Sequence, residues 1–278
     1  MPATCRICGA PTRPSALLAP LPFATCSDCG FSGREDRVED DVHAIYEGGA
    51  YTEVRRFEYA DPRTLRDRRR QARVRLNFVA AHARVGRLLD IGAAGGVFVE
   101  QALVRGYDAE GVEPTPEFAA FARESLGVPV RTTTVEQAAL ADDALDVATM
   151  WHVLEHVPDP VGVLSLLRGA LRRGGVVAIE VPNAAGHLAR SQGRAWASLE
   201  PDVHVNQFGP RSLAAALAGA GFEVAEIGTV TITPYLPLVE RLQPGQVAHR
   251  LRGLRALRTP ATAHPDGHEL LRAVGRRP

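Results

Sequence analysis

The chain has 278 residues, and its 32 basic and 32 acidic side chains give a formal net charge of zero. All of the basic residues are arginine, which excludes Schiff-base, Walker-A and Ser-Lys chemistry because each of these needs a lysine. The zero net charge argues against a nucleic-acid partner. No run of about 18 apolar residues is present and no apolar segment follows Met1, so we expect no membrane partner and a cytoplasmic location.

The cysteines all lie within the first 29 residues, as two C-x-x-C pairs. Cys5 and Cys8 form the first pair, Cys26 and Cys29 form the second, and a glycine follows each pair. Four thiolates complete a tetrahedral Zn²⁺ site without an open position, so the spacing predicts a structural zinc ribbon over residues 1–35. Two disulfides or a redox pair are the alternatives; the expected compartment argues against disulfides, and no thioredoxin-like elements surround either pair. The sequence leaves open whether the ribbon stabilises the chain, docks a carrier or contacts substrate.

Residues 36–85 are polar and predicted to be helical, as a linker or lid that carries Tyr46 and Tyr51. From Arg87 onward, short apolar runs alternate with amphipathic stretches. The apolar runs predict strands at Arg87–Ile91, Ala109–Val112, Val128–Arg131, Leu145–Trp151, Val176–Val181 and Phe222–Ile227, with a last strand near Val230–Thr233. The stretches between them predict helices at Val97–Arg105, Pro116–Leu126, Val161–Arg173 and Arg211–Ala220.

Buried strands that alternate with helices indicate an α/β fold with a doubly wound, mostly parallel sheet. We assign this domain to residues 86–235. Residues 236–278 are rich in arginine, proline and glycine, and we expect no stable structure there.

The most informative segment is the glycine-rich turn between the first of these strands and the helix after it. The strand ends with Asp90 and Ile91, and the turn then contains, in order, Gly92, Ala93, Ala94, Gly95 and Gly96. Glycines let a ligand approach the backbone closely, and parallel sheets bind ligands at the carboxyl ends of their strands. The next strand ends with Glu113, whose carboxylate suits the two hydroxyls of a ribose.

Dinucleotides and S-adenosyl-L-methionine both bind to turns of this kind. The dinucleotide fingerprint G-x-G-x-x-G is not met, because Ala94 stands at its second glycine and the spacing of Gly92 and Gly95 does not fit. The carboxylate of Asp90 would also suit a pyrophosphate poorly, whereas it suits a ligand with an ammonium and a sulfonium group. The residues therefore favour S-adenosyl-L-methionine as the cofactor, and a nicotinamide oxidoreductase is the disfavoured alternative.

Several motifs occur in an order that resembles the class I S-adenosylmethionine-dependent methyltransferases. Leu88–Gly96 resembles their D-x-G-x-G-x-G motif, with Ala94 at the middle glycine and Gly95 in place of a usual Thr or Ser. Val112–Pro114 resembles their ribose-binding motif. Further matching segments are Thr134–Glu136, Leu145–Val147, Leu154–Pro160, Leu171–Gly175 and Val181–Asn183.

This resemblance covers residues 86–235 and implies a Rossmann-like, seven-stranded methyltransferase sheet. It places Glu113 at the ribose and Val135 at the adenine of the cofactor. The remaining cofactor-binding residues that it implies are Asp90, Gly92, Ala93, Gly95, Gly96 and Trp151.

A zinc ribbon ahead of such a domain is similar to a bacterial subgroup that includes sugar C-methyltransferases and natural-product tailoring enzymes. The subgroup shows tyrosines before the core, then a tryptophan and a P-x-x-H-x-x-x-F segment, which Trp196 and Pro201–Phe208 match. We expect no counterpart of the C-terminal domain of the sugar enzymes, since only about 45 residues follow the core. The resemblance therefore implies a small-molecule acceptor without naming it.

Methyl transfer to a hydroxyl or a carbon acid needs a base, and histidine suits neutral pH. We expect His204 to be the general base, because it lies in the irregular segment 182–209 where an acceptor pocket is expected. The alternative is that His204 only orders this loop. His152 is the second catalytic candidate. Trp196 and Phe208 either wall the pocket or cover the sheet.

His152, Glu155 and His156 also match the H-x-x-E-H pattern of inverted zinc peptidases. That chemistry needs both histidines on one face of a long helix, whereas this segment follows a strand and precedes Pro158 and Pro160. Some ubiquinone-biosynthesis O-methyltransferases carry an E-x-x-E-H metal site at this place, and here His152 replaces the first glutamate. We favour a third interpretation, in which Glu155 and His156 hydrogen-bond the loop beside the cofactor.

The sequence as a whole predicts an enzyme that moves a methyl group from S-adenosyl-L-methionine to a hydroxyl, carbon or amine of a small metabolite. The alternative is an RNA- or protein-binding zinc-ribbon protein, for which Arg55–Arg75 offers charge but few aromatic side chains. The sequence does not determine the oligomeric state.

Overall fold

The computed structural model describes residues 4–36, 61–230 and 267–278. Tyr46, Tyr51 and the strand expected beyond Val230 therefore lie outside the described residues. The chain forms two compact units: unit 1 comprises Met1–Glu39, His152–Ser165 and Ile179–Gly275, and unit 2 comprises Asp40–Trp151, Leu166–Ala178 and Arg276–Pro278. Within the described ranges, no helix combines the length and the apolar character that crossing a bilayer requires.

A seven-stranded sheet has the strand order β10-β11-β8-β7-β4-β5-β6. The pairs β4–β5, β4–β7 and β5–β6 are parallel, which confirms the predicted α/β class with a mostly parallel sheet. The strands are β4 (Arg87–Ile91), β5 (Asp108–Glu113), β6 (Val130–Thr132), β7 (Leu145–Trp151), β8 (Leu171–Pro182), β10 (Glu223–Val230) and β11 (Leu270–Arg276).

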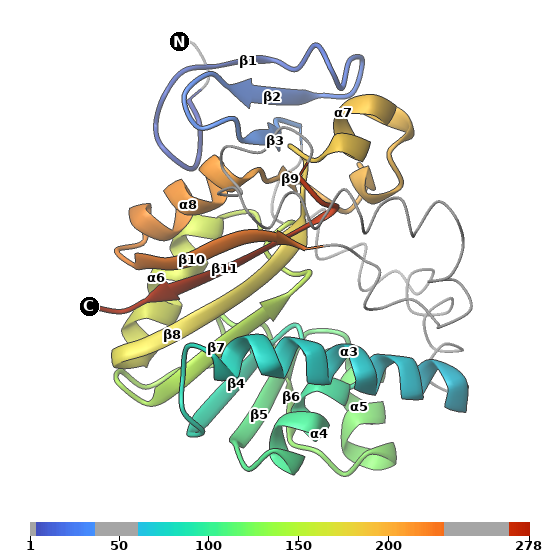
Figure 1. The fold of residues 1–278 in the computed structure, drawn as a ribbon, viewed down its shortest axis with the longest axis vertical. Helices are drawn as coiled ribbons and strands as arrows, with labels where there is room; N and C mark the ends of the chain where they lie inside the picture. Colours follow the sequence, from blue (N-terminus) through green and yellow to red (C-terminus); the bar gives the residue numbers. More distant parts are fainter. Residues whose placement is uncertain (1–3, 37–60, 231–266) are drawn as a thin grey trace. The chain divides into compact units, whose positions relative to one another are not determined.

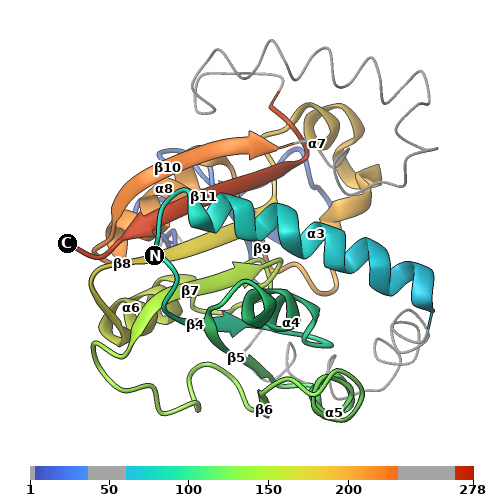
Figure 2. The same ribbon diagram turned by 60° about the horizontal axis from the view of Figure 1, so that its bottom comes forward.

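Unit 2 holds β4 to β7, which lie side by side in Figure 2, and three of the helices. These helices are α3 (Pro62–Ala80), α4 (Val97–Val104) and α5 (Pro116–Ser125). Helix α3 begins where the Asp61 carboxylate accepts hydrogen bonds from the backbone N–H groups of Arg63 and Thr64, which the helix itself leaves unpaired. The first residue of α4, Val97, packs on Phe118 of α5.

Unit 1 holds a second, antiparallel sheet with the strand order β1-β2-β3-β9, the first three strands of which are drawn in blue in Figure 1. Its strands are β1 (Thr12–Pro14), β2 (Phe23–Cys26), β3 (Ser32–Arg34) and β9 (Asn206–Gln207). The ribbon strand β3 thus pairs with a strand that lies more than 170 residues further along the chain. The remaining helices are α6 (Pro160–Ala170), α7 (His187–Gln192) and α8 (Pro210–Gly219), with short 3₁₀ turns at Gly193–Ala195 and Ala197–Leu199.

The helices expected around residues 97, 116, 161 and 211 and the strands from 87 to 227 are all present. Helix α6 ends at Ala170, three residues before the expected end, because Leu171 already belongs to β8.

The prediction of an unstructured C-terminus is wrong for its last residues, which form β11. Leu271, Ala273 and Val274 are fully buried there. Arg272 interrupts the apolar run, so the sequence pattern does not indicate a strand, and the structure pairs this charge with Glu180 of β8.

Candidate functional site

The glycine-rich turn joins β4 to α4 within unit 2. Backbone hydrogen bonds run from Ala93 N to Val112 O at 3.0 Å and from Gly96 N to Ala93 O at 2.9 Å. Gly92 and Gly96 have positive φ angles of 64° and 75°. A Cβ atom at Gly96 would lie 2.7 Å from the Cβ of Ala122, so the turn and α5 approach too closely for any side chain. These hydrogen bonds and the close approach to α5 fix the path of the turn at the end of β4.

Ala94 stands at the middle glycine of the motif and keeps the glycine-like backbone. Its φ is 46°, in the left-handed region, which costs a residue with a Cβ about 1–2 kcal/mol. Such strain persists only where surrounding structure imposes it, often at a ligand site. Gly95, next to Ala94, is buried.

Glu113 ends β5, and its carboxylate reaches back to the turn. Oε2 accepts a hydrogen bond from Ala94 N at 2.9 Å, and Oε1 accepts one from Thr115 N at 2.9 Å. Burial raises the pKa of this carboxyl, and the two backbone donors counteract the rise. An ionised carboxylate has about four acceptor positions, so each oxygen keeps one for a further donor such as a ribose hydroxyl.

Asp90 ends β4 and is only 2% exposed. The hydroxyl of Thr149 donates to its Oδ1 at 2.6 Å. Burial raises the pKa of Asp90 to about 7, although Thr149 and the charge of Arg75 act in the opposite direction. A cationic ligand group beside this carboxylate would favour its ionised form.

Trp151 ends β7. Its ring packs on Phe98 with the centroids 5.2 Å apart, and the guanidinium carbon of Arg75 lies 5.2 Å from the indole centroid. The indole Nε1 is buried without a hydrogen-bond partner among the described residues, which is rare for a donor and points to a ligand acceptor. Val135, expected at the adenine, is buried in the segment between β6 and β7.

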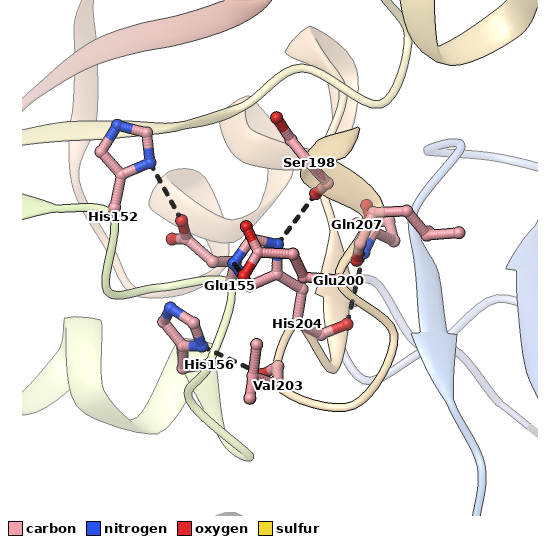
Figure 3. Close-up of polar contacts among 9 residues, drawn as sticks. His152, Glu155, His156, Ser198, Glu200, Val203, His204 and Gln207 are labelled. Carbon is pink, nitrogen blue, oxygen red and sulfur yellow. Dashed lines mark hydrogen bonds and ion pairs between the residues drawn. The ribbon is translucent and has the colours of Figure 1, made fainter. Parts of the chain in front are cut away.

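The segment after β7 carries His152 and Glu155, which belong to unit 1. The residues form turns, and His152 has φ 59°, so the helix face that an inverted zinc peptidase needs is not present. Nδ1 of His152 lies 3.3 Å from Oε1 of Glu155, as drawn in Figure 3, and Nε2 lies 3.2 Å from Oε1 of Glu180. Packing lowers the pKa of His152, but the two carboxylates outweigh this effect and raise the pKa to about 9. The imidazole is therefore a cation at neutral pH.

Glu155 also lies close to two other imidazoles, and one polar side-chain atom from each of Glu155, His156 and His204 lies within 4.8 Å of the other two. Nδ1 of His156 is 3.0 Å from the carbonyl of Val203, and Nδ1 of His204 is 2.9 Å from the carbonyl of Ser198 (Figure 3). Because a carbonyl only accepts, the Nδ1 of each ring carries a proton. Burial lowers the pKa of His156 to about 4, so this ring is neutral at pH 7.

The four cysteines gather in the ribbon with a spacing that fits a zinc ion. Sγ of Cys5 lies 3.7 Å from Sγ of Cys29, and Sγ of Cys8 lies 3.5 Å from Sγ of Cys26. Zn–S bonds of about 2.3 Å in a tetrahedron place sulfur atoms about 3.8 Å apart, whereas a disulfide needs about 2.05 Å. The geometry thus fits the expected Zn²⁺ and not the alternative of two disulfides.

The ribbon is built into the segment that carries His204. Gly33 pairs with Asn206, and the backbone N–H of Arg34 donates to the carbonyl of Val205 at 2.9 Å. Trp196 packs in one apolar cluster with Leu18, Phe23, Ala189 and Leu199, and the rings of Phe31 and Phe208 lie 5.4 Å apart. Trp196 and Phe208 therefore pack against the ribbon.

Two charged residues of this region were not predicted from the sequence. Glu180 is fully buried and holds His152, and Arg272 is 7% exposed and holds Glu180. A glutamate inside the apolar run Val176–Val181 was a signal that could have been used, because an ionised group in a buried strand needs a partner.

Comparisons with known proteins agree with this geometry. Residues 64–227 match a family model described as a methyltransferase domain. A ubiquinone biosynthesis O-methyltransferase of Xanthomonas campestris pv. campestris is 31% identical over 176 residues, which cover 58% of this chain and 74% of the relative. A protein of the same name from Cereibacter sphaeroides is 35% identical over 102 residues, covering 35% of this chain and 41% of the relative.

Solved structures support the fold. A SAM-dependent methyltransferase from Thermotoga maritima, described as a possible histamine N-methyltransferase, has a TM-score of 0.55 at 19% identity and covers 86% of this chain and all of its own. A SAM-dependent methyltransferase from Archaeoglobus fulgidus also has a TM-score of 0.55 at 19% identity, with 75% of this chain and 94% of its own covered. With its matched domain, its glycine-rich turn and its methyltransferase sheet, the chain belongs to the SAM-dependent methyltransferases.

Proposed function

We propose that the protein transfers the methyl group of S-adenosyl-L-methionine to a small metabolite, with a hydroxyl as the first candidate and a carbon or amine as the alternatives. The observation that carries this proposal is the Glu113 carboxylate, which two backbone N–H groups hold at the glycine-rich turn with acceptor positions left for a ribose. The names of the O-methyltransferase relatives support the hydroxyl. A role in tailoring a sugar or another secondary metabolite rests on the sequence resemblance.

Each cofactor group has a candidate partner in unit 2. Glu113 would accept the ribose hydroxyls, Asp90 would face the ammonium group, and the unpaired Nε1–H of Trp151 would donate to an acceptor of the ligand. The cofactor supplies the electrophilic methyl group when it is bound. The protein itself contributes mainly by holding the reactants in line.

Removal of the acceptor proton is assigned to a histidine, and exposure separates the two candidates. The His152 side chain is 36% exposed, whereas that of His204 is 8% exposed. Since a base must come within hydrogen-bond distance of the acceptor, we place His152 first and His204 second. The raised pKa of His152 means that the rate should increase with pH until about pH 9, as the imidazole becomes neutral.

Cys5, Cys8, Cys26 and Cys29 would hold a structural Zn²⁺. Four thiolates leave no coordination position for a substrate, so the ion would contribute folding energy and no chemistry.

Calorimetric titration of the purified protein tests the cofactor. S-adenosyl-L-methionine and S-adenosylhomocysteine should bind with micromolar affinity, and Glu113→Ala should abolish measurable binding. Glu110→Ala is the matched control, because Glu110 lies in the same strand but pairs with Arg131 on the surface. Binding of NAD in place of both ligands would overturn the proposal.

A methyl-transfer assay with labelled cofactor and a panel of phenols, sugars and amines tests the base. His152→Gln should lower turnover by about 10²–10⁴-fold while leaving the cofactor affinity unchanged. Full activity of His152→Gln, with the loss appearing only in His204→Gln, would transfer the role to His204.

A further inference from the structure

The last strand of the sheet contributes a charged side chain to the His152 group. Nε of Arg272 in β11 donates to Oε2 of Glu180 in β8 at 2.6 Å, across 92 positions of the chain. Both side chains are buried, Glu180 completely. The other oxygen of Glu180 lies 3.2 Å from Nε2 of His152. Glu180 therefore bridges a permanent cation and an imidazole.

This pair does more than neutralise two charges. A buried ion pair gives little net stability compared with apolar side chains of similar volume, so stability alone does not explain its presence. Glu180 is also bound to His152 through the backbone, since the N–H of His152 donates to the carbonyl of Glu180 at 2.8 Å. The backbone N–H and the imidazole of His152 thus both contact Glu180 of β8.

The backbone of His152 increases the need for this support. Its φ of 59° lies in the left-handed region, which is unfavourable for a side chain with a Cβ and persists only when neighbouring groups impose it. Among the described residues, the charged and titratable groups around its imidazole are Glu155 in the segment after β7 and Glu180 in β8, which Arg272 of β11 binds. His156 and His204 lie next to Glu155.

We propose that Arg272 is a positioning residue, which holds Glu180 ionised and in place so that Glu180 orients the imidazole of His152. The proposal rests on the proposed function for the use that is made of His152, namely proton removal from the acceptor. The positioning itself can be measured without cofactor or acceptor.

The test is a histidine NMR titration of the full chain with ¹³C- and ¹⁵N-labelled imidazoles, in which His152→Gln identifies the resonance. Arg272→Gln should lower the pKa of His152 by about half a unit or more, because Glu180 is then no longer held ionised beside Nε2 and is one of the two carboxylates that raise this pKa. The shift should vanish in a Glu180→Gln background. Arg276→Gln is the matched control: it removes an arginine of the same strand that binds the carbonyls of Gly174 and His82, and it should leave His152 unchanged.

An unchanged titration of His152 in a folded Arg272→Gln protein would overturn the proposal. A shift that persists in the Glu180→Gln background would do so as well, because Arg272 would then act directly. If Arg272→Gln does not fold, Arg272→Lys keeps the charge but loses the planar guanidinium, and a spectrum identical to the wild type would also contradict the positioning role. Failure of the wild-type protein to bind S-adenosyl-L-methionine would remove the proposed function and leave the NMR result standing.

Discussion

The glycine-rich turn of unit 2 and the histidine–glutamate group of unit 1 are assembled in different ways. Between Asp90 and Glu113 the chain builds the first region from adjacent elements and holds it with backbone N–H groups. The second region takes His152, His204 and Arg272 from segments that are far apart, and side-chain ion pairs hold much of it.

The two regions therefore differ in the substitutions that they tolerate. Backbone N–H donors stay in place when a neighbouring side chain is substituted, so the turn depends on the backbone conformation. The histidine–glutamate group depends on single side chains, and also on the ribbon, whose strand β3 pairs with β9 two residues after His204. We therefore expect damage to the ribbon to act on one region and damage to the turn to act on the other.

The largest effect is expected from Cys26→Ser. Structural zinc sites in small domains contribute about 10–16 kcal/mol of folding free energy, so loss of one thiolate should release the metal and unfold the ribbon. Hydrogen exchange of the amides at 204–208 should then increase strongly, while the affinity for S-adenosyl-L-methionine changes little. Ser27→Ala, next to Cys26, is the control and should show neither change. Unaltered protection of the amides at 204–208 would show that the ribbon does not support this segment.

Gly96→Ala should damage the other region. The left-handed φ costs a residue with a Cβ about 1–2 kcal/mol, and the close contacts with Ala122 and Val128 should add about 1–3 kcal/mol. Gly127→Ala is the matched control, because Gly127 has a similar φ of 66° but open space around its Cβ position. Chemical denaturation measures the loss of unfolding free energy in both variants. Equal losses for the two variants would mean that the turn can move away from α5.

The sequence predicted the first region well, since its information is local. Asp90, Glu113 and the glycines lie in one strand–turn–helix–strand unit, and the structure places the Glu113 carboxylate on the turn, while their binding of a cofactor stays a prediction. Trp151 could be named as a candidate from the end of one predicted strand alone. The cysteine pairs were equally local, with two short loops for one ion.

The second region was predicted only in part, because its contacts are not local. His152 and His204 were named from their loops, but nothing in the order of residues indicates that Glu180 links His152 to an arginine of the C-terminal segment. The charge of Arg272 interrupts the apolar run of β11, so the sequence pattern does not predict a strand there. The packing of Trp196 on the ribbon also depends on the β3–β9 pairing, which only the folded chain shows.

Binding of the cofactor should release protons from the turn region near pH 7. Burial holds the pKa of free Asp90 at about 7, so the carboxyl carries about half a proton at that pH, and an adjacent ammonium group would displace it. Calorimetric binding enthalpies at pH 7 should therefore vary with the ionisation enthalpy of the buffer. The dependence should disappear in Asp90→Asn, which keeps the acceptor for Thr149.

Asp90 also has a consequence for stability without ligand. Its pKa in the folded chain lies above its unfolded value, so its contribution to stability is complete at low pH and is lost as the pH rises through about 7. Asp90→Asn should therefore gain thermal stability relative to the wild type above pH 7 while its cofactor affinity falls. Equal pH profiles of the melting temperature for the two proteins would show that Asp90 is already ionised in the free protein.

The smallest effect should come from Ala94→Gly, which restores the glycine of the common motif. Glycine removes the cost of the left-handed backbone, about 1–2 kcal/mol, but loses about 0.4–1 kcal/mol through the greater freedom of the unfolded chain. The net result should be a gain of between zero and about 1.6 kcal/mol in denaturation experiments. Ala139→Gly, at a φ of 49° outside the turn, should give a similar gain. If only Ala94→Gly also changes the affinity for S-adenosyl-L-methionine, then the Cβ of Ala94 shapes the cofactor site; if neither does, the hydrogen bond from Ala94 N to Glu113 alone matters at this position.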